Sequence, residues 1–181
     1  MKKLIVLALV LSMATMANAG LKISVDGQID PPDTQIVLAY SDTVVIDVWS
    51  DGQELADAPA FLYISGPGSL DISHAINFVN PPGYSASIDL WTDFPMPGDQ
   101  VWMDLAIPAI GAVIPLGKAI DGIILHCEGV GEVTLSLYMD RTPNVGGIFE
   151  LMDTQVIHQI PEPMTMALLG LGGLFLRRRS K

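Results

Sequence analysis

The chain is poor in several features that define common protein classes. It has a single cysteine, Cys127, so no disulfide can form within it and stability must come from packing. No apolar run reaches the roughly 20 residues that a helix needs to cross a bilayer comfortably. The Gly-x-Ser-x-Gly motif of serine hydrolases is absent, as is the twelve-residue calcium loop with ligands at alternating positions. These absences argue against a disulfide scaffold, a serine hydrolase and an EF-hand.

Positive charge is the scarcest feature, with nine Lys and Arg against twenty Asp and Glu. Nineteen of the acids but only three of the basic residues lie between positions 20 and 160, which gives that segment a formal charge of −16. Nucleic-acid binding is excluded, because its affinity comes largely from Lys and Arg on phosphates. The other six basic residues occupy the two ends of the chain: Lys2, Lys3, Arg177, Arg178, Arg179 and Lys181.

Residues 1–19 have the pattern of a secretory signal peptide. Two lysines precede an apolar stretch over 4–16, and Ala17-Asn18-Ala19 forms a small-x-small cleavage site. We expect signal peptidase to cut after Ala19, leaving Gly20 as the first residue. Because position 20 is Gly and not Cys, this is not a lipoprotein signal. The sequence therefore predicts an exported protein.

Residues 161–181 combine Pro161-Glu162-Pro163, an apolar run over 164–176 and the cluster Arg177-Arg178-Arg179. The run can form a helix of roughly 20 Å, and the arginines would hold its end on the cytoplasmic side. The alternative is a terminal core helix. The tail resembles the PEP-CTERM sorting signal of envelope-bearing bacteria. The resemblance implies recognition, and cleavage, by the membrane enzyme exosortase, with transient membrane anchoring through this tail.

The segment between the two ends alternates apolar and polar residues with period two, and Gly, Pro, Asn and Asp interrupt it every eight to twelve residues. This pattern predicts one all-β domain over 20–160, a jelly-roll or immunoglobulin-like β-sandwich of about nine strands. Residues 70–78 fit either one helical turn or a bent strand. The expected strands span 21–25, 36–39, 43–50, 60–64, 87–91, 101–107, 119–127, 132–139 and 148–157.

The middle segment also resembles the cohesin and carbohydrate-binding-module group of jelly-roll sandwiches. The resemblance lies in residues 21–26, in 41–49, and in the strand, Gly-x-Gly turn and strand of 123–137. Those modules bind partners, so the resemblance implies binding of a glycan or a docking protein.

Each tryptophan lies two residues from an aspartate, and the alternation turns both members of each pair away from the predicted core. An aromatic platform with nearby carboxylates is the usual way for a sheet to hold sugar rings. Alternatively, these aromatic residues lie at a sheet edge or under a loop and fill space. The candidate ligand face comprises Trp49, Trp91, Trp102, Asp47, Asp89, Asp104 and the outward Tyr138.

Two of these acids raise the question of a metal. If a hairpin placed Trp91 opposite Trp102, Asp89 would lie opposite Asp104, and like charges directly across a ladder are unfavourable. Then the register differs, the strands belong to different sheets, or Ca²⁺ lies between the two carboxylates. No other metal site or cofactor is expected, because the histidines are scattered and Cys127 alternates into the core.

Together these features predict an exported, non-enzymatic protein of the cell envelope or extracellular matrix, associated with exopolysaccharide and without catalytic residues. The alternatives are a carbohydrate-binding module and a cohesin-like docking module.

Overall fold

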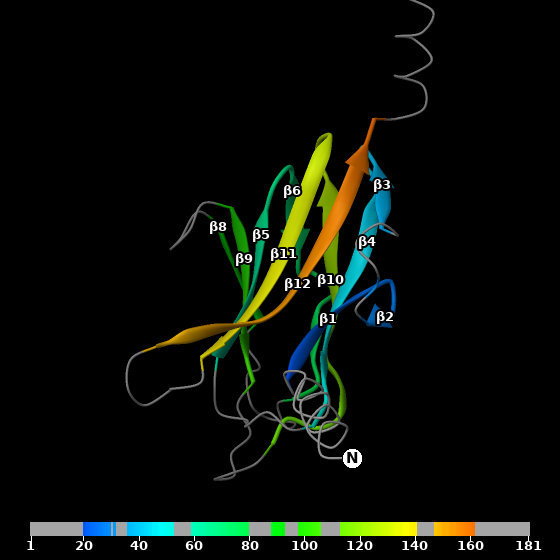
Figure 1. Ribbon diagram of the computed structural model, residues 1–181. Coiled ribbons are helices and arrows are strands. Elements are labelled where there is room, and N and C mark those ends of the chain that lie inside the picture. Colours follow the sequence, from blue (N-terminus) through cyan, green and yellow to red (C-terminus); the bar gives the residue numbers. More distant parts are fainter. Residues whose placement is uncertain are drawn as a thin grey trace, which may run out of the picture.

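The structure is a computed structural model, in which residues 20–29, 31, 36–52, 59–79, 88–92, 98–105, 113–140 and 147–161 are described. The predicted signal peptide and residues 162–181 of the tail lie outside these ranges. The described residues form an all-β domain of two sheets, as the sequence predicts (Figure 1).

The first sheet, sheet A, is antiparallel and has the strand order β2-β1-β4-β10-β6, with β7 also pairing with β10. Two bulges interrupt the β10–β4 ladder, one after Lys118 and one after Ile120. The strands of sheet A are β1 (Leu21–Val25), β2 (Gln28–Ile29), β4 (Thr43–Ser50), β6 (Gly68–Asp71), β7 (Ile76–Asn77) and β10 (Gly117–Cys127).

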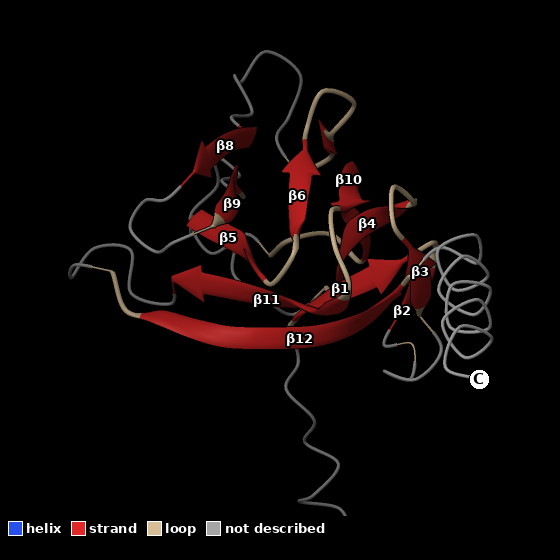
Figure 2. Ribbon diagram, turned by 90° about the horizontal axis from the view of Figure 1, so that it is seen from above, coloured by secondary structure: helices blue, strands red, loops and turns tan. Residues whose placement is uncertain are grey.

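The second sheet, sheet B, has the order β3-β12-β11-β5-β9-β8 and is antiparallel except for the β3–β12 pair. Strand β12 of this sheet is long and curves along one side of the molecule with β11 beside it (Figure 2). The strands of sheet B are β3 (Val37–Ala39), β5 (Pro59–Ser65), β8 (Ile88–Thr92), β9 (Asp99–Asp104), β11 (Gly131–Asp140) and β12 (Phe149–Ile160).

All nine predicted strands are present with ends shifted by a few residues, and the structure adds β2, β6 and β7. The expectation for residues 70–78 was a single element. Instead β6 ends at Asp71, and a turn closed by the Ala75 N–H donating to the Ile72 carbonyl (2.9 Å) leads into β7. The strand predicted to end at residue 107 ends at Asp104.

The core lies between the two sheets and consists of the inward residues that period-two alternation predicts. In β4 and β11 every second side chain is buried, and in β9 Val101 and Met103 are buried. Leu90 of β8 alternates with the outward Asp89 and Trp91, yet it is 39% exposed because β8 is the edge strand of sheet B. The inward residues of β4 and β11 are Val44, Ile46, Val48, Val133, Leu135, Leu137 and Met139.

Two aspartates of sheet B cap backbone N–H groups of sheet A. The Ile23 N–H of β1 donates to Asp153 Oδ2 (2.7 Å), and the Leu70 N–H of β6 donates to Asp99 Oδ2 (2.9 Å). A carboxylate that accepts an N–H from a strand edge satisfies a group that would otherwise seek a partner strand. The two sheets are therefore linked by a polar contact on each open side of the sandwich.

Candidate functional site

The outer face of sheet B carries a row of aromatic side chains. The register places Trp102 of β9 opposite Phe61 of β5, and Phe61 opposite Tyr138 of β11. Leu151 of β12 lies opposite Tyr138 and continues the row. Trp102, Phe61 and Tyr138 alternate with core residues on their own strands, so they point away from the main core.

The rings of this row stack on one another. The Phe61 ring centroid lies 4.9 Å from that of Trp102 and 4.9 Å from that of Tyr138, with interplanar angles of 24° and 17°. Phe149 makes edge contacts with Phe61 at 5.0 Å and with Trp102 at 5.6 Å. These spacings are close to the distance between neighbouring strands, so the rings stand side by side across the sheet. Phe61 is consequently only 5% exposed although it lies outside the main core.

Trp91 extends the row at the edge strand β8. Its ring centroid lies 5.3 Å from that of Trp102 with a tilt of 35°, and 41% of the residue is exposed. Asp89, two residues earlier, is exposed and lies opposite Trp102. We define the aromatic face as Trp91, Trp102, Phe61, Tyr138 and Phe149.

The observed register resolves the question of the two acids. Trp91 pairs with Gln100 and Asp89 with Trp102, so Asp89 is not opposite Asp104, whose partner on β5 is Pro59. Of the three explanations for an unfavourable pair, a different register is the correct one. Within the described residues, no group of three or more His, Cys, Asp or Glu side chains is placed to hold a metal ion.

The seven predicted ligand residues do not share one face. Asp89, Trp91, Trp102, Asp104 and Tyr138 belong to sheet B. Asp47 and Trp49 belong to β4 of sheet A, so the expectation that all three tryptophans contribute to one surface is wrong. Alternation along a strand indicates which side of its own strand a residue occupies, but not which sheet the strand joins.

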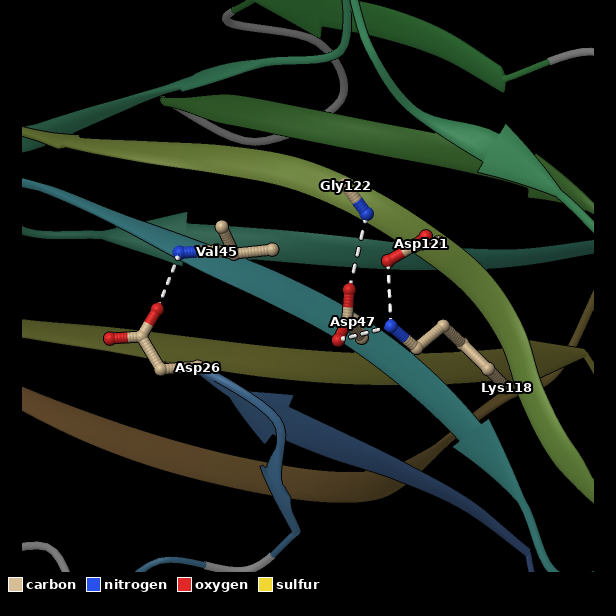
Figure 3. Close-up of polar contacts among 6 residues, drawn as sticks. All are labelled: Asp26, Val45, Asp47, Lys118, Asp121 and Gly122. Carbon is tan, nitrogen blue, oxygen red and sulfur yellow. Dashed lines mark hydrogen bonds and ion pairs between the residues drawn. The ribbon is translucent and has the colours of Figure 1, made fainter.

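Asp47 is also not solvent-exposed, although it points away from the core as predicted (Figure 3). It is 2% exposed, and its Oδ2 lies 3.0 Å from Lys118 Nζ while its Oδ1 accepts the Gly122 N–H at 3.1 Å. Gly122 has a φ of +81°, and a Cβ there would lie 2.9 Å from the His74 carbonyl oxygen. The second bulge of β10 therefore requires glycine and turns its N–H toward Asp47.

Lys118 also contacts Asp121, with Nζ 2.7 Å from Oδ1. The hydrogen bond to Asp121 raises the pKa of Lys118, with a further contribution from Asp47. The hydrogen bond from Lys118 lowers the pKa of Asp121. One lysine thus serves two carboxylates, and this cluster stabilises the fold.

Two further titratable side chains of sheet A are Cys127 and His126 of β10. Cys127 is a buried free thiol, and desolvation raises its pKa. His126 alternates with the buried Leu125 and Cys127 and faces outward, with Nε2 4.0 Å from Asp71 Oδ2.

Sequence reasoning missed two members of the aromatic face, Phe61 and Phe149, and it also missed Tyr63 on the same strand as Phe61. Phe61 and Tyr63 alternate with the core residues of β5, and Phe149 begins β12. The signal was present in the first two, because two aromatic residues on the outward positions of one strand suggest a covered or binding face. Phe149 carries no such signal, since it reaches the row only through the pairing of β12 with β11.

The predicted tail leaves the domain directly from a strand. β12 ends at Ile160, which is paired with β3, while the pairing with β11 ends one residue earlier at Gln159; Pro161 follows. Ile160 aligns with Ala39 of β3, and the His158 N–H donates to the Ile36 carbonyl at 3.0 Å. The start of the tail is therefore fixed to the sandwich.

Comparison with known proteins places a family motif at this junction. Residues 159–180 match the model of the PEP-CTERM protein-sorting motif, which indicates an exported protein sorted to the cell envelope. No curated protein sequence matches the chain significantly. Within the described residues, no helix has the length and apolar character of a membrane span.

Among solved structures, similar chains include the human F-spondin reeler domain, with 11% identity, a TM-score of 0.44, and coverage of 78% of this chain and 93% of that one. A chain from the complex of a CaDoc0917 variant with CaCohA2 has 14% identity and a TM-score of 0.39, with coverage of 77% and 99%.

Proposed function

We propose that the protein is a non-enzymatic domain that exosortase sorts to the cell envelope or extracellular matrix through its C-terminal tail. The motif match at residues 159–180 is the observation that carries this proposal. Pro161, Glu162 and Pro163 form the recognition element, and Arg177, Arg178 and Arg179 hold the end of the apolar run at the cytoplasmic side during sorting.

The attachment of the tail supports this function. β12 is paired with β11 up to Gln159 and with β3 up to Ile160, so a force or orientation imposed on the tail is transmitted directly to a folded domain. Pro161 and Pro163 stiffen the junction, because each fixes its own φ. A processing enzyme would therefore meet the Pro-Glu-Pro segment at a defined distance from the sandwich.

Fractionation of cells tests the sorting proposal. The full chain should reach the outer envelope or medium when exosortase is present and accumulate in the inner membrane when it is deleted. In cells that have exosortase, a Glu162→Ala variant should accumulate in the inner membrane, as the wild-type chain does when exosortase is deleted. Glu150→Ala is the matched control and should be sorted normally. Normal delivery of the wild type without exosortase would contradict the proposal.

A second candidate function is glycan binding by the aromatic face. Within the aromatic face Trp91 is the most exposed ring, and Asp89 on the same strand offers carboxylate oxygens to sugar hydroxyl groups. Because the inner rings stack on one another, they rigidify the face, and the exposed end of the row at Trp91 is the stacking position. Asp104 and Tyr138 supply polar groups along the same face. The exopolysaccharide of the envelope is the proposed ligand.

Tryptophan fluorescence during titration with extracted envelope polysaccharide tests this candidate. A saturable shift should be lost in Trp91→Ala and retained in Trp49→Ala, because Trp49 belongs to the other sheet. Equal loss in both variants, or no saturable shift, would reject the aromatic face as a glycan site. If beads carrying the protein instead enrich one partner protein in a Trp91-dependent way, the docking alternative replaces the glycan.

A further inference from the structure

The end of the sandwich from which the tail leaves carries exposed apolar side chains. Val130, in the turn between β10 and β11, is 61% exposed, and Ile160 and Tyr40 are half-exposed. Gly131 pairs with Gln159, so Val130 comes next to Ile160, and Tyr40 follows Ala39, the partner of Ile160. These three residues and Val37 of β3, also half-exposed, are the exit patch.

Backbone hydrogen bonds join the turns at this end. The Ser41 N–H donates to the Cys127 carbonyl (3.0 Å), and the Cys127 N–H donates to the Asp42 carbonyl (2.9 Å). The Glu128 N–H donates to the Pro67 carbonyl (3.1 Å). The β3–β4, β5–β6 and β10–β11 turns are thus held as one unit, so the exit patch is presented with little conformational freedom to lose on binding.

The sequence fixes how far the exit patch can lie from a membrane. Only residues 161–163 separate Ile160 from the apolar run that begins at Met164. Ile160 and Met164 are four residue steps apart, which is about 13–14 Å when the chain is extended. The headgroup layer on each side of the hydrocarbon core is about 5–7 Å thick. When the apolar run is inserted, Ile160 therefore lies in the headgroup layer or less than about 10 Å above it, which leaves the exit patch within reach of the lipid interface.

We propose that the exit patch docks on the lipid interface while the tail is membrane-inserted. Tyrosine prefers this interface because its ring is apolar and its hydroxyl is polar. Val130 and Ile160 add apolar area beside it. The occupant is a zwitterionic lipid surface, because the exposed Glu128 and Glu132 at this end would be repelled by anionic headgroups. This inference rests on the proposed sorting function of the tail.

The test uses the full chain reconstituted in phosphatidylcholine vesicles, with Cys127→Ala removing the native thiol. An environment-sensitive nitrobenzoxadiazole label is attached at Val130→Cys, or at Leu116→Cys as a matched control. Leu116 is 80% exposed and precedes Gly117, which pairs with Ser50 at the opposite end of β4 from the exit patch. The label at position 130 should shift to the blue and be quenched severalfold more than the control by headgroup-level spin-labelled lipid.

One further variant and one change of lipid composition sharpen the test. With the label at Tyr40→Cys, Val130→Ser and Ile160→Ser together should remove most of the quenching. Replacing half of the lipid by phosphatidylglycerol should reduce the quenching, and added salt should restore it.

Each outcome has a defined meaning. If the chain co-floats with vesicles but position 130 is quenched no more than position 116, the docking inference is wrong and the tail function stands. If the chain does not co-float, the tail function itself fails, and with it the docking. A blue-shifted label at position 130 before vesicles are added would overturn the inference, because the chain's own tail or a second copy would then cover the patch.

Discussion

At the scale of single residues, Asp47 shows how local geometry changes the meaning of a sequence position. Its outward position in β4 predicts a solvated carboxylate, yet the bulged strand β10 brings Lys118 and the Gly122 N–H onto it. A buried carboxylate is tolerated only with compensating partners. Asp47 is therefore a structural residue.

Replacing Lys118 by Met should lower the free energy of unfolding by about 2–3 kcal/mol, because the buried Asp47 carboxylate keeps the Gly122 N–H but loses its positively charged partner. Asp121→Asn is the milder control, since Asp121 is more exposed and Lys118 keeps Asp47. Urea denaturation of both variants measures the difference. Equal losses of unfolding free energy in the two variants would show that burial of the Asp47 carboxylate does not require Lys118.

The same cluster gives the stability a pH dependence with a defined sign. The pKa of Asp121 is lowered on folding, so its contribution is present above its unfolded pKa of about 3.9 and is lost as pH falls through the folded value. The pKa of Lys118 is raised, so its contribution is present below about 10.4 and is lost as pH rises through the folded value. In urea titrations across pH, Lys118→Met should flatten both limbs.

Substitutions at Phe61 and at Trp91 should distinguish a ring that stabilises the fold from a ring that is available for binding. Phe61→Ala removes a nearly buried ring that stacks on two neighbours, and we expect it to cost about 3 kcal/mol of unfolding free energy. Trp91→Ala, at the exposed end of the same row, should cost less than about 1 kcal/mol. Chemical denaturation monitored by far-UV circular dichroism checks both. A larger loss for Trp91→Ala would mean that the row is stabilised from its edge strand.

At the scale of strands and sheets, the link between β1 and β12 depends on one carboxylate. Asp153→Ala should destabilise the domain by about 1–3 kcal/mol, because the Ile23 N–H loses its acceptor at a largely covered site. Asp153→Asn keeps an acceptor oxygen and should cost less. Hydrogen exchange at Ile23 supplies the local readout: its amide should lose protection in the alanine variant and retain most of it in the asparagine variant.

The strands themselves could be predicted from the sequence, because β4 and β11 alternate so regularly that period two marks both their extent and their buried side. The register of β8 on β9 could not, since either Gln100 or Trp102 can face Trp91 without disturbing the alternation. The separation of Trp49 from Trp102 depends on which sheet each strand joins. The burial of Asp47 depends on a bulge that only Gly122 permits. Long-range pairing decides all three.

At the scale of the whole molecule, the proposed processing of the two ends would change the net charge. The terminal segments hold six of the nine basic residues, so removing them takes the formal charge from −11 for the whole chain to −16 for residues 20–160. Loss of Arg177, Arg178 and Arg179 removes the cations that would hold the tail in place. A strongly acidic domain is then better suited to release, solubility and mutual repulsion than to residence on an anionic surface.

Intact-mass measurement of the protein from envelope material should accordingly find a chain that begins at Gly20 and lacks the three arginines. The same material from a strain without exosortase should retain them, because signal peptidase acts on the other end and is unaffected. Isoelectric focusing gives an independent readout, since the processed chain should focus at a lower pH than the unprocessed one. Recovery of full-length tail in mature surface protein would count against cleavage while leaving export intact. The two ends of the chain are thereby tested separately in one preparation.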